Sequence, residues 1–291
     1  MNVYEVITNR IITSLEAGTV PWRTPWTTST PINMVSKKAY RGVNVFLLGC
    51  SGYSSNLWLS FKQAKDKGGC VRKGEHYTPV FFSGFYVKDR VTKKIRFAGK
   101  NEPGAFFMSK FFQVFNVTQC DGIEVPVGDA AKTEFEQNQA CENVVSSWMG
   151  CPDIEHGGIR ACYIPSQDKI QMPEKVAFTT PAEYYSTLFH EMTHSTGASK
   201  RLDRKGITDT IMFGSHNYSF EELVAECGAA FLCGRTGILN QTIDNSAAYI
   251  ASWISKLKSD PKWVIDAAGQ ASKAADMIMG AAEATPEKEE E

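Results

Sequence analysis

The sequence predicts an α+β protein of two domains: a basic α+β domain over residues 1–125, and a mainly helical domain with a small sheet over residues 126–291. The length of 291 residues suffices for two domains of ordinary size. Residues 1–125 carry 17 Lys and Arg against 8 Asp and Glu, a net of +9, whereas residues 126–291 carry 14 against 24, a net of −10. Alternating aromatic segments lie mainly in the first part, and apolar patterns of helical period dominate the second. This asymmetry favours a basic module for a polyanion joined to an acidic module; an uneven scatter of solubilising charge is the alternative.

Composition excludes several classes of protein. The chain is 43% apolar and 22% charged, which is typical of a soluble globular protein. It has no apolar run near the roughly 20 residues that span a bilayer, and its N-terminus lacks the pattern of a signal peptide. The eight cysteines are scattered without a C-x-x-C pair. We therefore expect a cytoplasmic protein with reduced thiols and no membrane partner.

The basic part begins with an amphipathic helix over residues 4–15 and a Pro- and Trp-containing loop over residues 19–34. A second helix is expected to start near Asn44. Aromatic segments at residues 80–87, 95–97 and 110–116 read as strands.

Basic residues interleave with aromatic ones in this part, which is the pattern of a surface for single-stranded nucleic acid. The charges follow the backbone, and bases stack on the rings. Duplex-binding proteins more often show a recognition helix or zinc fingers, and neither is visible. The alternative is that the rings fill a core, which is the commoner fate of tryptophan. The candidate DNA contacts are Trp22, Trp26, Lys38, Tyr40, Arg41, Asn44, Trp58, Arg72 and Lys73.

The acidic part follows a predicted linker at residues 118–135. A helix is expected over residues 135–149 and a short hairpin over residues 161–173. Two further helices are predicted near residues 247–257 and 264–279. The acidic tail at residues 280–291 is expected to be flexible.

The pattern H-E-x-x-H occurs at His190, Glu191 and His194. On a helix, positions i and i+4 share a face, so two imidazoles can bind one Zn²⁺ while the intervening Glu serves as general base. Thr180 and Glu183 form a capping-box pattern that predicts the start of such a helix. A chance match in a helix with two surface histidines is the alternative.

A catalytic zinc site needs a third protein ligand and an open position. Glu222 and Glu226 lie one turn apart on the next predicted helix, so one of them can bind the metal while the other orients a ligand. Ser219 and Glu222 also fit a capping box, which would give Glu222 a structural role. Both assignments therefore stay open, with Glu222 favoured.

These residues predict a hydrolytic centre. Glu191 would act as general base on the attacking water, and the metal would polarise a scissile carbonyl. Tyr218 or His216 would donate to the oxyanion. Zn²⁺ is the expected cofactor, with Mn²⁺ or Co²⁺ as substitutes, and a protein is a possible substrate.

An ordered set of short motifs runs along the chain. In the first half the motifs are Pro21-Trp22, Pro25-Trp26, Tyr40-Arg41-Gly42-Val43-Asn44, Trp58, Phe61, Gln63, Gly68-Gly69 and Val71-Arg72-Lys73-Gly74-Glu75. In the second half they are Tyr184-Tyr185-Ser186-Thr187-Leu188-Phe189-His190-Glu191, Thr196-Gly197, Arg201-Leu202 and Phe220-Glu221-Glu222-Leu223-Val224-Ala225-Glu226. In this order, the motifs resemble those of the ArdC-type plasmid antirestriction proteins over residues 3–280.

This resemblance implies a single-stranded-DNA-binding domain followed by a zincin-like metallopeptidase domain. It also implies protection of the plasmid strand that enters during conjugation from the restriction enzymes of the recipient. The second half is distantly similar to SprT-like proteases but offers Glu222 where they use a third His, as gluzincins do. Two alternatives remain: a protease whose main role is to cleave proteins on DNA, and a DNA-binding shield with a structural metal site.

Overall fold

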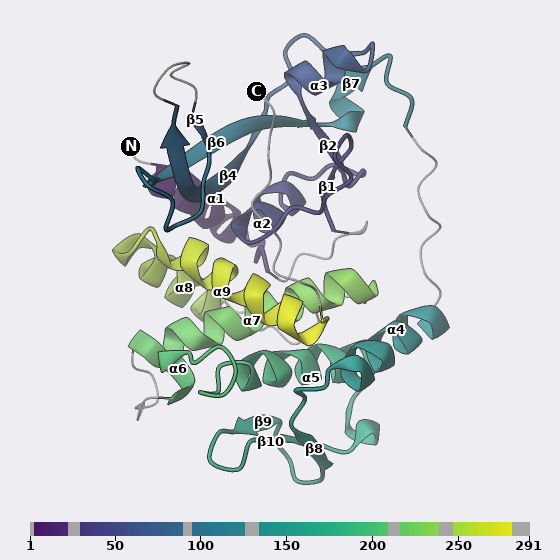
Figure 1. The fold of residues 1–291 in the computed structure, drawn as a ribbon. Coiled ribbons are helices and arrows are strands. Elements are labelled where there is room, and N and C mark those ends of the chain that lie inside the picture. Colours follow the sequence, from purple (N-terminus) through teal and green to yellow (C-terminus); the bar gives the residue numbers. More distant parts are fainter. Residues whose placement is uncertain are drawn as a thin grey trace.

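The structure is a computed structural model that describes residues 3–22, 30–89, 95–125, 134–208, 216–238 and 247–280. Figure 1 shows a curved sheet with short helices above a layer of longer helices, with a small sheet at the base. This arrangement confirms the predicted α+β class, a β-rich half-barrel followed by a mainly helical part with a small sheet. We call residues 1–125 the N-terminal half and residues 126–291 the C-terminal half.

Two long antiparallel strands, β4 (Thr78–Lys88) and β6 (Phe106–Asn116), form the centre of the main sheet. The order of the five strands is β1-β2-β6-β4-β5. The other strands are β2 (Leu57–Ser60), beside β6, and the edge strands β1 (Ile32–Asn33) and β5 (Ile95–Phe97). The aromatic segments predicted as strands are therefore confirmed as β4, β5 and β6.

Three helices accompany this sheet: α1 (Val3–Glu16), α2 (Val43–Gly49) and α3 (Phe61–Asp66). The first two confirm the helices predicted over residues 4–15 and near residue 44. The linker prediction is wrong at its start. Residues 117–119 form a 3₁₀ helix, and β7 (Cys120–Asp121) pairs with β3 (Cys70–Val71). Residues 126–133 of the predicted linker lie outside the described residues.

The C-terminal half is helical apart from a three-stranded sheet of order β8-β10-β9. Its strands are β8 (Asp153–His156), β9 (Cys162–Ile164) and β10 (Lys169–Met172), and the last two confirm the predicted hairpin. Its helices are α4 (Glu134–Ser147), α5 (Pro181–Ser195), α6 (Lys205–Thr208), α7 (His216–Thr236), α8 (Ala247–Ser259) and α9 (Trp263–Ile278). Among the described residues, none of these helices is long and apolar enough to cross a membrane.

The largest hydrophobic core joins the two halves. Phe46 of α2 stacks on Phe231 of α7 with ring centroids 5.0 Å apart. Trp22 meets Trp253 of α8 edge to face at 5.7 Å. Such contacts bury apolar surface across the boundary, so the N-terminal helices are part of the support of the helical layer.

A glycine allows α5 and α7 to approach closely. A Cβ atom at Gly228 would lie 2.4 Å from Cγ2 of Thr193, which is far inside van der Waals contact. Only a residue without a side chain fits here. This close approach brings the side chains of α7 within reach of the histidines on α5.

Candidate metal centre and nucleic-acid surface

The helix that carries the H-E-x-x-H pattern starts as its sequence predicts. Thr180 is the N-cap, and its hydroxyl accepts a hydrogen bond from the backbone N–H of Glu183 at 3.1 Å. The Glu183 carboxylate in turn accepts from the N–H of Thr179 at 2.8 Å. These bonds satisfy free N–H groups of the first turn and fix where α5 begins.

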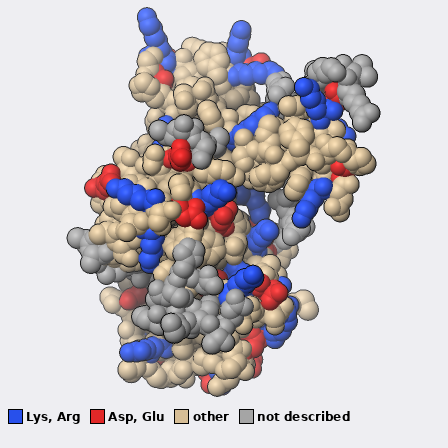
Figure 2. All heavy atoms as spheres, turned by 90° about the vertical axis from the view of Figure 1, so that its left-hand side faces the viewer, with Lys and Arg blue, Asp and Glu red and all other residues tan. Residues whose placement is uncertain are grey.

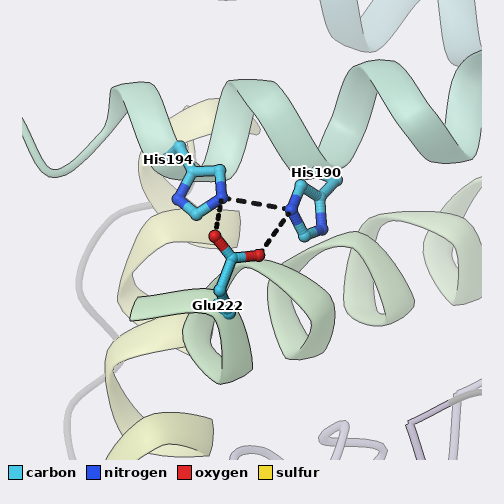
Figure 3. Close-up of side chains that lie close together, drawn as sticks. All are labelled: His190, His194 and Glu222. Atoms are coloured by element: carbon cyan, nitrogen blue, oxygen red, sulfur yellow. Dashed lines mark hydrogen bonds and ion pairs between the residues drawn. The ribbon is translucent and has the colours of Figure 1, made fainter. Parts of the chain in front are cut away.

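Three side chains from α5 and α7 converge on one point, as Figure 3 shows. Nε2 of His190 lies 3.1 Å from Nε2 of His194. Oε2 of Glu222 lies 3.5 Å from Nε2 of His190, and Oε1 of Glu222 lies 3.7 Å from Nε2 of His194. Of the described residues, these three form the one group of His, Cys, Asp and Glu able to hold a metal ion, with ligand atoms within 4.8 Å of one another.

The spacing of these atoms fits a divalent metal. In a tetrahedral zinc site with bonds of about 2.0–2.1 Å, ligand atoms lie roughly 3.3 Å apart. The measured separations of 3.1, 3.5 and 3.7 Å bracket that value. Two imidazoles and a carboxylate are also the donor set of catalytic zinc sites that keep one position open. His190, His194 and Glu222 therefore form a divalent-metal site.

The charges of the site stabilise one another. Burial alone would lower the pKa of His190, but the hydrogen bond with Glu222 and the charges of Glu191, Glu222 and Glu226 raise it to about 9. Burial alone would raise the pKa of Glu222, but its interactions with His190 and His194 lower it to about 2. A bound cation would take the place of the proton on His190 as the positive partner of Glu222, so metal binding would release that proton.

Glu221 is a functional residue that the sequence reasoning missed. Its Oε1 lies 3.3 Å from Nδ1 of His194, so the carboxylate holds the proton on Nδ1 and leaves Nε2 free as a ligand. Arg204 fixes this carboxylate with two hydrogen bonds, of 2.9 and 2.6 Å. The pair is buried. The sequence did offer a signal in the neighbouring pair Glu221-Glu222. Adjacent residues of a helix point in different directions, so Glu221 can contact a different group from the one that Glu222 contacts.

Glu226 lies one turn beyond Glu222 but faces a different group. Its Oε2 accepts a short hydrogen bond from the hydroxyl of Tyr249 on α8. Burial raises the pKa of Glu226 to about 7, against the lowering effects of the Tyr249 hydrogen bond, the His190 charge and a hydrogen bond from Trp22. The capping-box alternative for Glu222 does not hold, because α7 begins at His216 and Ser219 lies inside the helix.

Glu191 lies beside the metal ligands without being one of them. Its Oε2 accepts a hydrogen bond of 2.8 Å from the backbone N–H of Tyr163 on β9. Tyr218 lies on α7 one turn before Glu222, and burial and the interaction with that carboxylate raise its pKa to about 12. The side chain of His216 lies outside the described residues.

Four of the predicted DNA contacts are buried, and for these the prediction is corrected. Trp22 and Trp58 are each 1% exposed, so neither ring presents a face to a base. Tyr40 is buried against Trp58 in the same cluster. Asn44 is buried too, and its amide donates to the carbonyl of Phe81 and accepts from the N–H of the same residue. Through these two bonds Asn44 attaches α2 to β4 of the sheet.

The predicted arginine contacts are paired with carboxylates. Arg41 forms a short ion pair with Asp276 of α9, which also pairs with Arg235 of α7 at 3.0 Å. Arg72 pairs with Glu75 at 2.8 Å and with Asp121 at 3.5 Å. Lys38 and Lys73 are exposed, and Trp26 lies outside the described residues.

A row of exposed phenylalanines lies along the main sheet, which the sequence reasoning did not single out. Phe107 and Phe111 of β6 are 56% and 45% exposed on one face, and Phe61 at the start of α3 is 60% exposed beside Phe115. We call Phe61, Phe107 and Phe111 the Phe row. In Figure 2, Lys and Arg outnumber Asp and Glu on the upper part of the molecule, which contains this sheet.

Profiles of known families match both halves of the chain. That of the N-terminal domain of anti-restriction factor ArdC matches residues 1–115, and that of a zincin-like metallopeptidase matches residues 141–270. The chain is 35% identical over 289 residues to the uncharacterized protein y4eC of Sinorhizobium fredii, covering 95% of this chain and 91% of that protein. It is 33% identical over 298 residues to a DNA primase TraC of Escherichia coli, but that match spans 27% of the longer protein.

Two solved structures have the same fold. Both are crystal structures of the antirestriction ArdC protein from the R388 plasmid. The metal-free form aligns with a TM-score of 0.74 and 37% identity, covering 96% of this chain and 97% of that one. The Mn(II)-bound form aligns with a TM-score of 0.75 and 35% identity, covering 96% and 98%. With both halves matched and the metal triad in place, the chain belongs to the ArdC family of antirestriction proteins, with an ArdC N-terminal domain and a zincin-like metallopeptidase domain.

Proposed function

We propose that this protein binds single-stranded DNA that enters by conjugation, protects it from restriction enzymes, and carries a zinc peptidase in its C-terminal half. The observation that carries this proposal is the combination, in one chain, of the metal triad with the whole-length likeness to an antirestriction protein. We keep residue 125 as the proposed boundary between the two domains.

Metal binding and activation of water are assigned to four side chains. A bound zinc ion supplies Lewis acidity toward a peptide carbonyl and lowers the pKa of water; Mn²⁺ or Co²⁺ can take its place. His190, His194 and Glu222 hold the ion. Glu191, oriented by the N–H of Tyr163, takes a proton from the attacking water and passes it to the leaving amine.

Tyr218 is assigned to the oxyanion. With a pKa raised to about 12, its hydroxyl keeps its proton at neutral pH and can donate a hydrogen bond as negative charge develops on the carbonyl oxygen. Glu226 is not assigned as a ligand, since its carboxylate is engaged by Tyr249.

The DNA-binding surface is assigned to the Phe row with the exposed lysines Lys38 and Lys73. Exposed rings accept bases of any sequence by stacking, and lysines neutralise phosphates. In this assignment the Phe row takes the place of the buried residues that the sequence predicted as DNA contacts. Single-stranded DNA remains the proposed partner.

The test is conjugation into a restricting recipient, comparing plasmids that encode the wild type, Glu191→Gln and no protein. Glu191→Gln keeps the metal ligands and the size of the side chain but removes the general base. We expect the wild type to raise transfer over the plasmid without the gene. Equal transfer with and without the wild-type gene would overturn the proposed function.

Glu191→Gln also separates the second candidate, a peptidase whose main role is to cleave proteins on DNA. The observation that favours it is Glu191 itself, which a purely structural metal site would not need. Protection lost in this variant, with DNA affinity retained, would favour the peptidase. Protection retained would favour a shield that works by binding.

A further inference from the structure

Arg201, in the loop after α5, joins three parts of the C-terminal half at one point. Its guanidinium binds both oxygens of Asp168, at 2.7 and 2.9 Å. It also donates to the carbonyl of Ser195 at 3.0 Å and to that of Gly150 at 3.1 Å, and it lies over the ring of Trp148. The side chain is 8% exposed. A buried guanidinium with these partners fixes the turn of the hairpin against the end of α5 and the segment after α4.

The Asp168 carboxylate connects Arg201 with strand β9. Asp168 lies in the turn between β9 and β10, and its Oδ1 accepts a hydrogen bond of 2.8 Å from the hydroxyl of Tyr163 on β9. The Tyr163 side chain is buried. The backbone N–H of the same residue donates to Oε2 of Glu191 at 2.8 Å. Tyr163 therefore joins the carboxylate that Arg201 holds to the carboxylate of the proposed general base.

These contacts close a ring. Ser195, whose carbonyl accepts from Arg201, is the last residue of α5, and α5 also carries Glu191. Within the described part of the chain, β9 is an edge strand that pairs with β10 alone. The hydrogen bonds of the sheet therefore hold β9 on one side only, and the contacts of the ring hold its other side against α5.

The position of β9 matters because one of its N–H groups orients Glu191. A carboxylate oxygen that accepts a hydrogen bond from a fixed backbone group keeps one orientation. This bond engages Oε2, and no described residue donates a hydrogen bond to Oε1. Oε1 is thus the oxygen that is available to the attacking water of the proposed mechanism.

We propose that Arg201 and Asp168 are positioning residues for Glu191, which hold β9 so that the N–H of Tyr163 fixes the carboxylate of the general base. Neither residue is one of the metal ligands. A hairpin released from Arg201 would lose its fixed distance from α5, and the carboxylate would spend less time in the orientation that the reaction needs. This inference rests on the role of Glu191 in the proposed function.

The first measurement is hydrogen exchange at the amide of residue 163 in the full-length chain, compared with the amides of β10. Arg201→Ala removes the attachment, whereas Tyr163→Phe keeps the ring and the backbone N–H and loses only the hydroxyl. Relative to β10, we expect exchange at residue 163 to be about 10–100-fold faster in Arg201→Ala and about 2–10-fold faster in Tyr163→Phe. The ratio to β10 removes the effect of lower stability of the whole hairpin. Tyr163→Phe decides the outcome if Arg201→Ala does not fold.

The matched control for Tyr163→Phe is Tyr185→Phe. Tyr185 is also buried, and its hydroxyl also donates to a carboxylate, that of Glu142, which is not a member of the ring. This variant should lose stability and keep the exchange ratio at residue 163.

The second measurement is hydrolysis of fluorescent casein by the zinc-loaded chain, with bound zinc determined in parallel. In Arg201→Ala we expect kcat to fall about 10–100-fold while KM and zinc content stay nearly unchanged, because the base is displaced and the ligands are not. Lys200→Ala is the control, since it removes an exposed partner of the same Asp168 carboxylate and should change neither kcat nor exchange.

Two results would overturn the inference. One is exchange at residue 163 that rises in Arg201→Ala only as much as exchange in β10 does. The other is an unchanged kcat in Arg201→Ala despite faster exchange at residue 163. A wild-type chain that binds zinc and cleaves no casein would contradict the proposed peptidase instead. The exchange ratio needs neither substrate nor metal, so it would still decide whether Arg201 maintains the contact between Tyr163 and Glu191.

Discussion

Two short stretches of this chain carry recognisable polar residues, and the fold uses them in opposite ways. In residues 190–194, the two histidine side chains point to a common centre that Glu222 completes. In residues 40–44, each polar group attaches one part of the molecule to another. Arg41 pairs with Asp276, the N–H of Gly42 donates to the hydroxyl of Ser272 at 2.9 Å, and Asn44 binds the backbone of β4.

The difference teaches which motifs can be interpreted from spacing alone. Two histidines four apart on a helix share a face whatever surrounds them, so their meeting is a local property. The residues before α2 have no such constraint. Gly42 is held at a φ of 56°, a left-handed conformation that favours glycine, so its N–H can face α9. The roles of its neighbours follow from that docking.

The largest expected effect is loss of the metal. His194→Ala leaves two protein ligands, which seldom retain zinc, and the melting temperature in the presence of metal should fall toward that in EDTA. Metal analysis and thermal denaturation measure both. His156→Ala is the control, because His156 bonds Tyr184 at 2.9 Å and is not one of the ligands. Stoichiometric zinc in the double variant of His190→Ala and His194→Ala would contradict the site.

The second prediction concerns the attachment of the halves. Asp276 is buried between Arg41 and Arg235, so Asp276→Ala leaves two guanidinium groups without their carboxylate. We expect a loss of roughly 3 kcal/mol in the free energy of unfolding, at the lower end for a broken buried pair because both arginines keep some contact with water. Urea denaturation measures it. Arg41→Ala should cost less, since Arg235 still pairs with Asp276.

Arg41→Ala also tests whether Arg41 attaches the two halves or contacts DNA. If Arg41 is an attachment, Arg41→Ala lowers stability and leaves the affinity for single-stranded DNA unchanged. The opposite pattern, weaker binding with a flatter dependence on salt and normal stability, would restore Arg41 as a phosphate contact.

The sequence predicted the features that depend on local spacing, and it was less informative about those that depend on how distant elements pack together. Helices and strands follow local periodicity, and the metal histidines follow helical spacing. The sequence favoured Glu222 over Glu226 as the third ligand, but deciding between them required knowing how α5 and α7 cross, which depends on the close approach at Gly228. Strand alternation likewise shows which residues share a face but not which part of the face is covered. Phe81 and Phe111 are cross-strand partners, yet Phe81 is buried against Tyr4 of α1 while Phe111 is exposed.

The third prediction tests whether Glu221 supports the metal ligand His194. Glu221→Gln should weaken metal binding about 10–100-fold, because an amide holds the Nδ1 proton of His194 less strongly than a carboxylate does. Stability without metal should fall too, since Arg204 loses its charged partner. Glu155→Gln, on the exposed pair with Lys169, is the control for the substitution. Lower stability with unchanged metal affinity would limit Glu221 to anchoring Arg204.

The smallest expected effect lies on the sheet, where the sequence was least informative. Phe111→Ala should weaken binding of single-stranded DNA by about 1–3 kcal/mol if one base stacks on the ring. The dependence on salt should keep its slope of about −0.7 per phosphate contacted, because no charge is removed, whereas Lys73→Ala should flatten it. Fluorescence titrations over a range of salt concentrations measure both quantities. Val176→Ala removes an exposed apolar side chain from the C-terminal half and should change neither. Since Phe111 is already half in water, its loss should leave stability nearly intact, unlike that of its partner Phe81. Unchanged affinity in both Phe107→Ala and Phe111→Ala would move the DNA-binding surface away from the Phe row.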